Sequence, residues 1–314
     1  LAALGLRNKE IILPSFTNIA TGNAAYWNNC KLVFADVDRE TFNISIEEIK
    51  NKISQNTAAI LAVNMYGNPC DIKELEKLAH EYNIKLIFDS AQALGSGYKG
   101  KKIGNFGDVE VFSGSPTKHF STMEGGFVAT NNNELANLVR VARNYGSLPN
   151  YDAKILGLSA RMPEINAAAG LLTFKHLDLF VKNRRHYVDL YQKLLGKIGG
   201  FSFQKVNDDC ISTHHSYGVL IDEDEFGLNN FELAEALKAE GVLTKIYYHP
   251  PIHKLTAYSQ YSNINLPNTD YISTHVICPP LYESMDEELV IKICEAIEKI
   301  KLHSKEIKKV LNKN

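Results

Sequence analysis

The most informative stretch of the chain, residues 108–126, reads DVEVFSGSPTKHFSTMEGG. Residues 109–112 alternate in polarity as a strand does, and the small polar cluster at 113–115 predicts a tight loop after it. Lys118 stands in that loop. Most lysines are solvated surface charges, but ligands of open α/β sheets bind outside the carboxyl ends of strands. Lys118 is therefore a candidate catalytic residue.

The first half of the chain alternates strand and helix patterns. Residues 58–65 and 84–88 are mostly apolar, which is typical of parallel strands covered on both faces. Between them, Asp71 caps a predicted helix that runs to Tyr82 with apolar residues at helical spacing. This alternation predicts an α/β fold with a doubly wound, mainly parallel sheet. Its strands are expected at residues 10–13, 32–37, 58–65, 84–88, 109–112 and 127–130.

The pattern changes in the second half of the chain. Beyond Gly199, short strands such as 216–221 are followed by a predicted helix at 231–239 and a final helix from about Asp286. We therefore expect two domains, a large α/β domain of residues 1–180 and a smaller α+β domain of residues 181–314. The predicted helices before this change cover residues 134–144, 163–174 and 177–195.

The composition indicates an ordinary globular protein. Of 314 residues, 45% are hydrophobic and 22% charged, and a formal net charge of -2 offers no basic field for nucleic acid. No apolar run reaches membrane-spanning length, and the first residues given lack a basic segment followed by an apolar core, so we expect a cytoplasmic location. The five cysteines show no C-x-x-C spacing and are expected to be reduced. The chain starts at Leu1 with helix-like residues and no initiator Met, and we expect further residues of the large domain upstream.

Asp89 ends the strand predicted at 84–88, in the run IKLIFDSAQALG. A carboxylate there caps a turn or helix, or it keeps a charge inside a site. Paired with Lys118, it suits pyridoxal 5'-phosphate, because that cofactor needs a lysine amine for its Schiff base and a carboxylate to keep its pyridine nitrogen protonated. Both residues follow strands of one predicted sheet, so they can converge on one cleft.

Several longer motifs extend this pattern. Residues 88–130 read FDSAQALGSGYKGKKIGNFGDVEVFSGSPTKHFSTMEGGFVAT, and ARNYG, ARMPEINAAAG and YYHPPIH follow at 142–146, 160–170 and 247–253. In this order the motifs resemble the DegT/DnrJ/StrS family of sugar aminotransferases over nearly the whole chain. The resemblance implies a fold-type I pyridoxal-phosphate enzyme, a homodimer, and transfer of an amino group from glutamate to a keto carbon of a nucleotide-activated deoxysugar.

The resemblance also assigns roles to individual residues. It makes Lys118 the Schiff-base lysine, because the position before E-G-G is the family's own, and it makes Asp89 the partner of the pyridine nitrogen. Gln92 matches the family's glutamine beside the ring hydroxyl, and Ser113 matches the serine that binds the cofactor phosphate. As isolated residues, Gln92 and Ser113 would be read as ordinary turn hydrogen-bonding groups.

The chain departs from the family's pattern at three places. The family's Ser-Gly-Thr turn, which cups the phosphate with backbone donors at a helix N-terminus, belongs upstream of LAALGL. Asn18 occupies the position where relatives carry an aromatic ring stacked on the cofactor. Ser159 stands where many relatives have an asparagine that reaches the phosphate across the dimer interface. We expect Asn18 and Ser159 to be cofactor-binding positions with altered side chains.

Two other functions remain open at this stage. A sugar 3-dehydratase of the same fold has a histidine at the lysine position, and here Lys118 itself is present beside His119. A non-catalytic homologue with a structural or regulatory role would explain the three departures.

The histidines raise two further questions. His249 and His253 flank two prolines, so they cannot share a helix face as a zinc motif's pair would, and no metal site is expected. The resemblance places YYHPPIH near the mouth of the active site. His253 is therefore a candidate substrate contact, or part of a loop packed between the domains.

Overall fold

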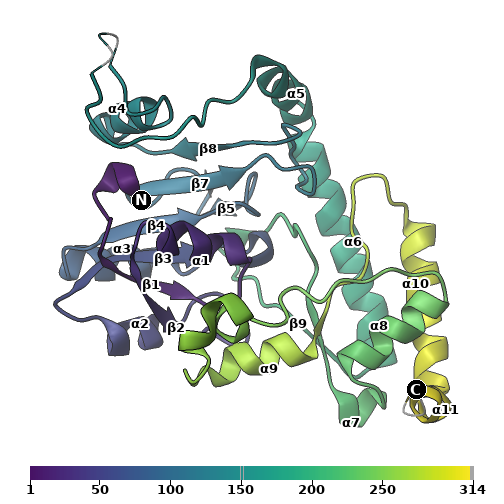
Figure 1. The fold of residues 1–314 in the computed structure, drawn as a ribbon. Helices are drawn as coiled ribbons and strands as arrows, with labels where there is room; N and C mark the ends of the chain where they lie inside the picture. Colours follow the sequence, from purple (N-terminus) through teal and green to yellow (C-terminus); the bar gives the residue numbers. More distant parts are fainter. Residues whose placement is uncertain (149, 151, 312–314) are drawn as a thin grey trace.

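The computed structural model describes residues 1–148, 150 and 152–311. Its central sheet has six strands in the order β2-β1-β3-β4-β7-β8, shown in Figure 1. Five strands run parallel, and β8 pairs antiparallel with β7. The strands are β1 Glu10–Pro14, β2 Lys31–Ala35, β3 Thr57–Val63, β4 Lys85–Asp89, β7 Val109–Ser113 and β8 Gly126–Ala129. The expected α/β fold with a mainly parallel sheet is confirmed.

Helices cover both faces of this sheet, which explains its continuous apolar strands. One face packs against α2, Ile46–Lys52, and α3, Ile72–Glu81. The other packs against α1, Ile19–Tyr26, and α4, Asn133–Ala142. Side chains on β1 show the division, since Ile12 belongs to the first core and Ile11 and Leu13 to the second.

The C-terminal part has a core of its own. Its sheet, in the order β12-β11-β9, consists of β9 Phe201–Phe203, β11 Val219–Ile221 and β12 Val276–Ile277. Tyr191 and Leu195 of α6 pack there with Ile293 and Ile297 of α10. Around this core lie α6 Leu177–Ile198, α7 Glu223–Phe226, α8 Asn230–Ala239, α10 Glu287–Leu302 and α11 Ser304–Leu311 (Figure 1).

Two details differ from the expected layout. The single final helix is wrong: its backbone breaks at His303, and α11 turns back to pack against α8. The segment 252–266, assigned to the smaller domain, instead packs its apolar side chains on the core of the large sheet. The chain thus crosses between the two cores more than once, and the boundary at residue 180, inside α6, stays a prediction.

The remaining elements are short or connect the two cores. No helix in the described ranges is both long and apolar enough to cross a membrane. The remaining helices are α5 Glu164–Phe174 and α9 Pro267–His275, with 3-10 turns at Ala2–Leu4, Met65–Gly67, Ile252–Lys254 and Thr256–Tyr261. A small antiparallel sheet joins β5 Gly97–Tyr98, β6 Lys101–Lys102 and β10 Cys210–Ile211.

Candidate active site

Polar side chains gather at the carboxyl edge of the large sheet. Asp89 is the last residue of β4 and pairs in register with Val111 of β7, so Ser113 lies at the same edge. Asn18, which follows β1, caps the N-terminus of α1 by accepting a hydrogen bond from the Ala20 N–H at 2.9 Å. These residues, with Gln92 and Lys118, line a cavity of about 680 Å³, which we call the strand-end cavity.

Asp89 is held by two hydrogen bonds from its own domain. Thr21 Oγ1 donates to Asp89 Oδ2 at 2.7 Å, and the Ala91 N–H donates to Oδ1 at 3.1 Å. Each carboxylate oxygen accepts one bond here, which leaves lone pairs for a further donor in the cavity. The carboxylate is therefore both oriented and available.

Gln92 is fixed from two sides. Its Oε1 accepts the Tyr66 N–H at 2.8 Å, and its Nε2 donates to the Tyr248 hydroxyl at 2.8 Å. Tyr248 belongs to the YYHPPIH motif, more than 150 residues away in sequence. This contact joins the strand-end cavity to the segment that runs between the two cores.

Lys118 lies in the loop between β7 and β8, where its N–H donates to the Ser115 carbonyl at 3.1 Å. Burial lowers the pKa of the Lys118 amine, while the negative charge of Asp89 acts to raise it. No ion pair among the described residues involves Lys118. A half-buried amine with a lowered pKa is neutral, and so nucleophilic, at lower pH than a surface lysine.

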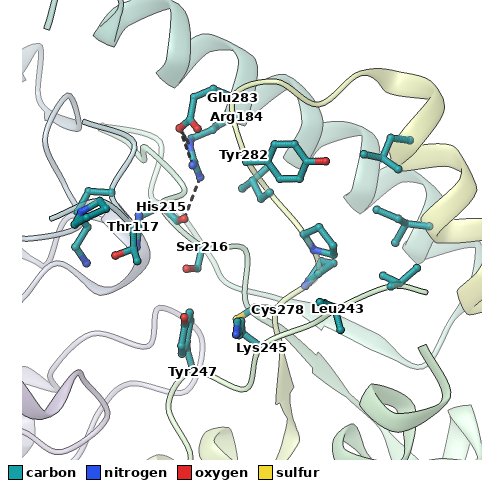
Figure 2. Close-up of a pocket in the computed structure, with 18 of the residues that line it drawn as sticks. Thr117, Arg184, His215, Ser216, Leu243, Lys245, Tyr247, Cys278, Tyr282 and Glu283 are labelled. Carbon is teal, nitrogen blue, oxygen red and sulfur yellow. Dashed lines mark hydrogen bonds and ion pairs between the residues drawn. The ribbon is translucent and has the colours of Figure 1, made fainter. Parts of the chain in front are cut away.

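A second cavity of about 800 Å³ meets the first at Lys118, and we call it the interdomain cavity. One wall carries Arg184, whose Nε and Nη2 atoms each lie 2.7 Å from Glu283 Oε1 (Figure 2). Arg184 Nη1 also donates to the carbonyl oxygens of His214 and His215 at 3.1 and 3.0 Å. The opposite end is apolar and includes Val242, Leu243, Leu281, Leu289 and Ile293.

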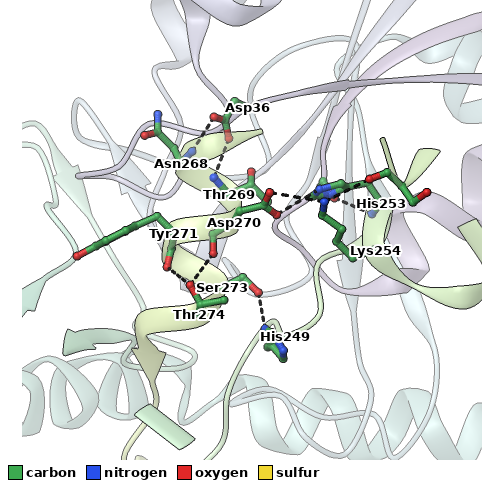
Figure 3. A network of polar contacts seen from close by, with 12 residues as sticks. Asp36, His249, His253, Lys254, Asn268, Thr269, Asp270, Tyr271, Ser273 and Thr274 are labelled. Atoms are coloured by element: carbon green, nitrogen blue, oxygen red, sulfur yellow. Dashed lines mark hydrogen bonds and ion pairs between the residues drawn. The ribbon is translucent and has the colours of Figure 1, made fainter. Parts of the chain in front are cut away.

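Two of the candidate residues lie apart from this group. Ser159 is exposed, forms an isolated bridge with Asn144, and lines neither cavity of its own chain. His253 is fully buried, with Nδ1 2.7 Å from Ser15 Oγ and Nε2 3.3 Å from Asp270 Oδ1 (Figure 3). His253 lines neither cavity in this structure, and its role as a substrate contact stays a prediction.

The structure also brings in residues that the sequence did not single out. Thr21 donates a hydrogen bond to Asp89, which lies 68 positions further along the chain, and no local sequence pattern predicts that contact. Arg184 and Glu283 are 99 positions apart, on α6 and in the loop before α10. For Tyr247 and Tyr248 the sequence did give an indication, because the YYHPPIH motif was expected near the active site. Both tyrosines line the interdomain cavity.

The residues present fit pyridoxal 5'-phosphate. The strand-end cavity offers an amine with a lowered pKa at Lys118 and an oriented carboxylate with free lone pairs at Asp89. Ser113, Ser115 and Thr117 place hydroxyl groups in the wall of the same cavity, where they can donate to a phosphate. A lysine and a carboxylate that share one cavity at the carboxyl edge of such a sheet define the fold-type I pyridoxal-phosphate class.

Comparison with known proteins agrees with that class. The chain belongs to the DegT/DnrJ/EryC1/StrS aminotransferase family, whose model matches residues 1–298. It is 32% identical to the dTDP-4-amino-4,6-dideoxy-D-glucose transaminase of Shigella dysenteriae, over 95% of this chain and 81% of that protein. It is 34% identical to the dTDP-3-amino-3,6-dideoxy-alpha-D-galactopyranose transaminase of Aneurinibacillus thermoaerophilus, over 92% and 78%.

Solved structures show the same fold. The crystal structure of DesI, determined in the presence of its TDP-sugar product, superposes with a TM-score of 0.93 at 29% identity, over 99% of this chain and 79% of that one. PseC of Helicobacter pylori, an aminotransferase involved in pseudaminic acid biosynthesis, superposes with a TM-score of 0.88 at 26% identity, over 95% and 82%. The expected family and fold are confirmed.

Proposed function

We propose that this protein is a pyridoxal-phosphate aminotransferase that moves an amino group from an amino acid, with glutamate as the expected donor, to a keto carbon of a nucleotide-activated deoxysugar. One observation carries the proposal: Lys118 lies where the strand-end and interdomain cavities meet, in the same cavity as Asp89. The sugar transaminases to which the chain is similar support the choice of substrate class.

Different residues of the cavity would have different roles in binding the cofactor. Lys118 Nζ is the amine that would hold the cofactor, and Asp89 is the carboxylate that would keep the ring nitrogen protonated. The bound cofactor supplies an electron sink for the electron pair left at the donor's Cα. Thr21 and the Ala91 N–H orient Asp89, and the hydroxyl of Ser113, which lines the same cavity, would bind the phosphate.

The lowered pKa of Lys118 matters twice. A neutral Nζ would hold the cofactor, and when it is free it would take the proton from the donor's Cα. Burial favours this neutral form by lowering the pKa of Lys118, and the Asp89 charge limits how far that pKa falls. The same atom thus serves as nucleophile and then as base.

The substrate would enter through the interdomain cavity. Its volume of about 800 Å³ suits a ligand larger than an amino acid. Lys118 and Tyr248 line the end nearest the sheet, and the exposed Lys245 lines the wall farther out. Lys245 offers a positive charge to a phosphate group, and the apolar end offers contact surface to a base.

A second copy of the chain would complete the site. Large apolar side chains stand exposed on and before α5, with Leu156 and Leu158 each 73% exposed and Ile165 72% exposed. An apolar surface of this kind is typical of an interface between subunits. Ser159 lies beside Leu158, so it would lie at the subunit boundary of a homodimer formed through this face.

Five free cysteines, four of them buried, are consistent with a reducing compartment, and we place the reaction in the cytoplasm.

The proposal is tested by following the two half-reactions separately. Protein incubated with pyridoxal 5'-phosphate should develop a visible absorbance band, which glutamate should remove while 2-oxoglutarate forms. A panel of dTDP-, GDP- and UDP-linked 4-keto and 3-keto deoxysugars should then restore the band and yield an amino sugar. Absence of any spectral change at saturating cofactor would favour a non-catalytic homologue, and loss of a sugar hydroxyl without amine incorporation would favour the dehydratase.

A further inference from the structure

Two histidines lie beside Lys118, and the proposed function gives them no role. His119 follows Lys118 in the chain, and His215 lines the interdomain cavity on the segment that leads to β11 (Figure 2). Their ring centroids are 6.0 Å apart. Both rings lie within reach of the charges of Lys118 and Arg184, which act with burial to lower both histidine pKa values.

The tautomer of His119 is fixed by its surroundings. Its Nε2 lies 2.6 Å from the Leu94 carbonyl oxygen, which can only accept, so Nε2 carries the proton. Burial lowers the pKa of His119 to about 4, so the ring is neutral near pH 7. Nδ1 of His119 therefore holds a lone pair. That atom is buried and has no hydrogen-bond partner among the described residues.

His215 also has a buried ring nitrogen without a hydrogen-bond partner among the described residues. Its backbone is held at both ends, because its N–H donates to the Tyr66 carbonyl at 2.8 Å and its own carbonyl accepts from Arg184. Its Nδ1 is also buried without a partner in the part of the chain that the structure describes. Burial lowers the pKa of this ring well below the usual range, so it too is neutral.

We propose that His119 and His215 act as a pair that positions the Lys118 amine. One buried water between the two rings donates to the lone pair on His119 Nδ1 and accepts from a proton on His215 Nδ1, which assigns that tautomer to His215. Nε2 of His215 is then left as an acceptor at the cavity wall, where it takes a hydrogen bond from Lys118 Nζ. The inference rests on the proposed function, since it assumes that Lys118 is the reacting amine.

The charges around the pair explain why neutral histidines suit this place. Lys118 and Arg184 face the rings from the β7–β8 loop and from α6, and Glu283 is already paired with Arg184. A third positive charge here would repel the ammonium form of Lys118. A neutral acceptor instead restricts the rotation of Nζ and leaves its lone pair free for the substrate, and such orientation raises a rate strongly.

The tautomers can be read without cofactor or substrate. Long-range 1H–15N correlation spectra of the histidine-labelled protein, assigned with the variants His119→Leu and His215→Leu, report which ring nitrogen carries the proton. We expect His119 with its proton on Nε2 and His215 with its proton on Nδ1, both neutral between about pH 8 and 5. In His119→Leu, His215 should become a mixture of tautomers. A proton on Nε2 of His215 in the parent protein would overturn the proposal.

Kinetics test the consequence for Lys118. His215→Leu should lower kcat about 10- to 100-fold with KM nearly unchanged, because orientation and not binding is lost. His215→Gln, which places an amide near the position of Nε2, should recover part of that loss. Because His119 acts only through His215, the double variant His119→Leu/His215→Leu should be no worse than His215→Leu alone. His186→Gln, an exposed histidine on α6, is the matched control and should behave as the parent.

The outcomes separate this inference from the proposed function. If the parent protein binds cofactor and transaminates but His215→Leu, folded as judged by its melting curve, keeps the parent kcat, the pairing is wrong and the function stands. Additive effects of the two substitutions would also overturn the pairing. If the parent shows neither the visible band nor glutamate conversion, the proposed function fails and the positioning role falls with it.

Discussion

The two cavities that meet at Lys118 are built in different ways. In the strand-end cavity, Asp89 is held by Thr21 and Ala91, all within the large sheet and its connections. In the interdomain cavity, the wall depends on Arg184, which is 3% exposed and bonds to segments that lie 30 and 99 positions away. The chemistry is thus fixed by one rigid sheet, while the surface for the substrate is assembled across two cores. Substrate choice can therefore change without disturbing the reacting groups.

Replacing Lys118 by alanine should have the largest effect, because it removes the amine that lines both cavities. We expect kcat/KM for amino transfer to fall by about 10⁴-fold or more, since nucleophile and base are lost together. The visible absorbance of cofactor linked to the lysine should also disappear. Lys101→Ala, a change of an exposed lysine on β6, serves as the control.

The same variant offers a direct chemical check. Treatment with borohydride fixes the cofactor to the parent protein, and peptide mapping should locate it on Lys118. A borohydride-fixed cofactor in Lys118→Ala would mean that another lysine holds it, and the assignment of both cavities would then be wrong.

Asp89→Asn tests the strand-end cavity alone. An amide cannot keep a pyridine nitrogen protonated, so we expect the glutamate half-reaction to slow by a factor on the order of 10²–10³. The pKa of Lys118 should fall further, because the carboxylate charge that raises it is gone. Stopped-flow absorbance across pH measures both effects. Thr21→Val, which removes only one hydrogen bond to Asp89, should give a smaller loss in the same direction. Equal losses in the two variants would contradict the role of the Asp89 charge.

The buried histidines near the interdomain cavity lead to a prediction about the free energy of unfolding. Burial lowers the pKa of His119 and His214 to about 4, from an ordinary value of 6.5. Between these values the unfolded chain binds protons that the folded chain excludes, so stability is full above about pH 6.5 and is lost as pH falls toward 4. Protonation of His119 and of His214 should each lower the free energy of unfolding by roughly 3 kcal/mol between pH 6.5 and 4. The lowered pKa of His215 adds to this loss.

Urea melts at pH 7.5, 6.0 and 4.5 measure this loss. His119→Leu removes one titrating group and should flatten the pH dependence, whatever it does to stability at pH 7.5. A free energy of unfolding that stays constant between pH 6.5 and 4.5 would contradict the burial of these histidines in neutral form.

The contrast between the cavities also explains what the sequence could predict. Asp89 and Ser113 end strands whose apolar runs are visible in the sequence, and parallel pairing brings strand ends to one edge without further information. Arg184 and Glu283 carry no local signal, because their meeting depends on how α6 packs against α10. The motif around His253 was expected near the site, but the sequence could not show which of its side chains is buried, because burial of a single side chain depends on tertiary packing. The tyrosines beside it line the cavity instead.

Asn18 offers the smallest effect and the sharpest test of how the strand-end cavity holds its cofactor. Asn18 now caps α1, and a phenylalanine would lose that cap at a cost of about 1 kcal/mol of stability. In exchange, an aromatic face over the cofactor ring should contribute about 0.5–1.5 kcal/mol, a roughly 2- to 12-fold lower Kd for pyridoxal 5'-phosphate. Asn18→Ala loses the cap without gaining the ring, so it isolates the two contributions.

Fluorescence titration of the cofactor and thermal melts of the apoprotein report these two contributions separately. The apoproteins of Asn18→Phe and Asn18→Ala should melt at similar temperatures below the parent, because both lack the cap at α1. Only Asn18→Phe should bind cofactor more tightly than the parent. If both variants bind cofactor equally, position 18 does not lie over the ring. The strand-end cavity would then hold its cofactor through Lys118, Asp89 and the hydroxyls after β7 alone.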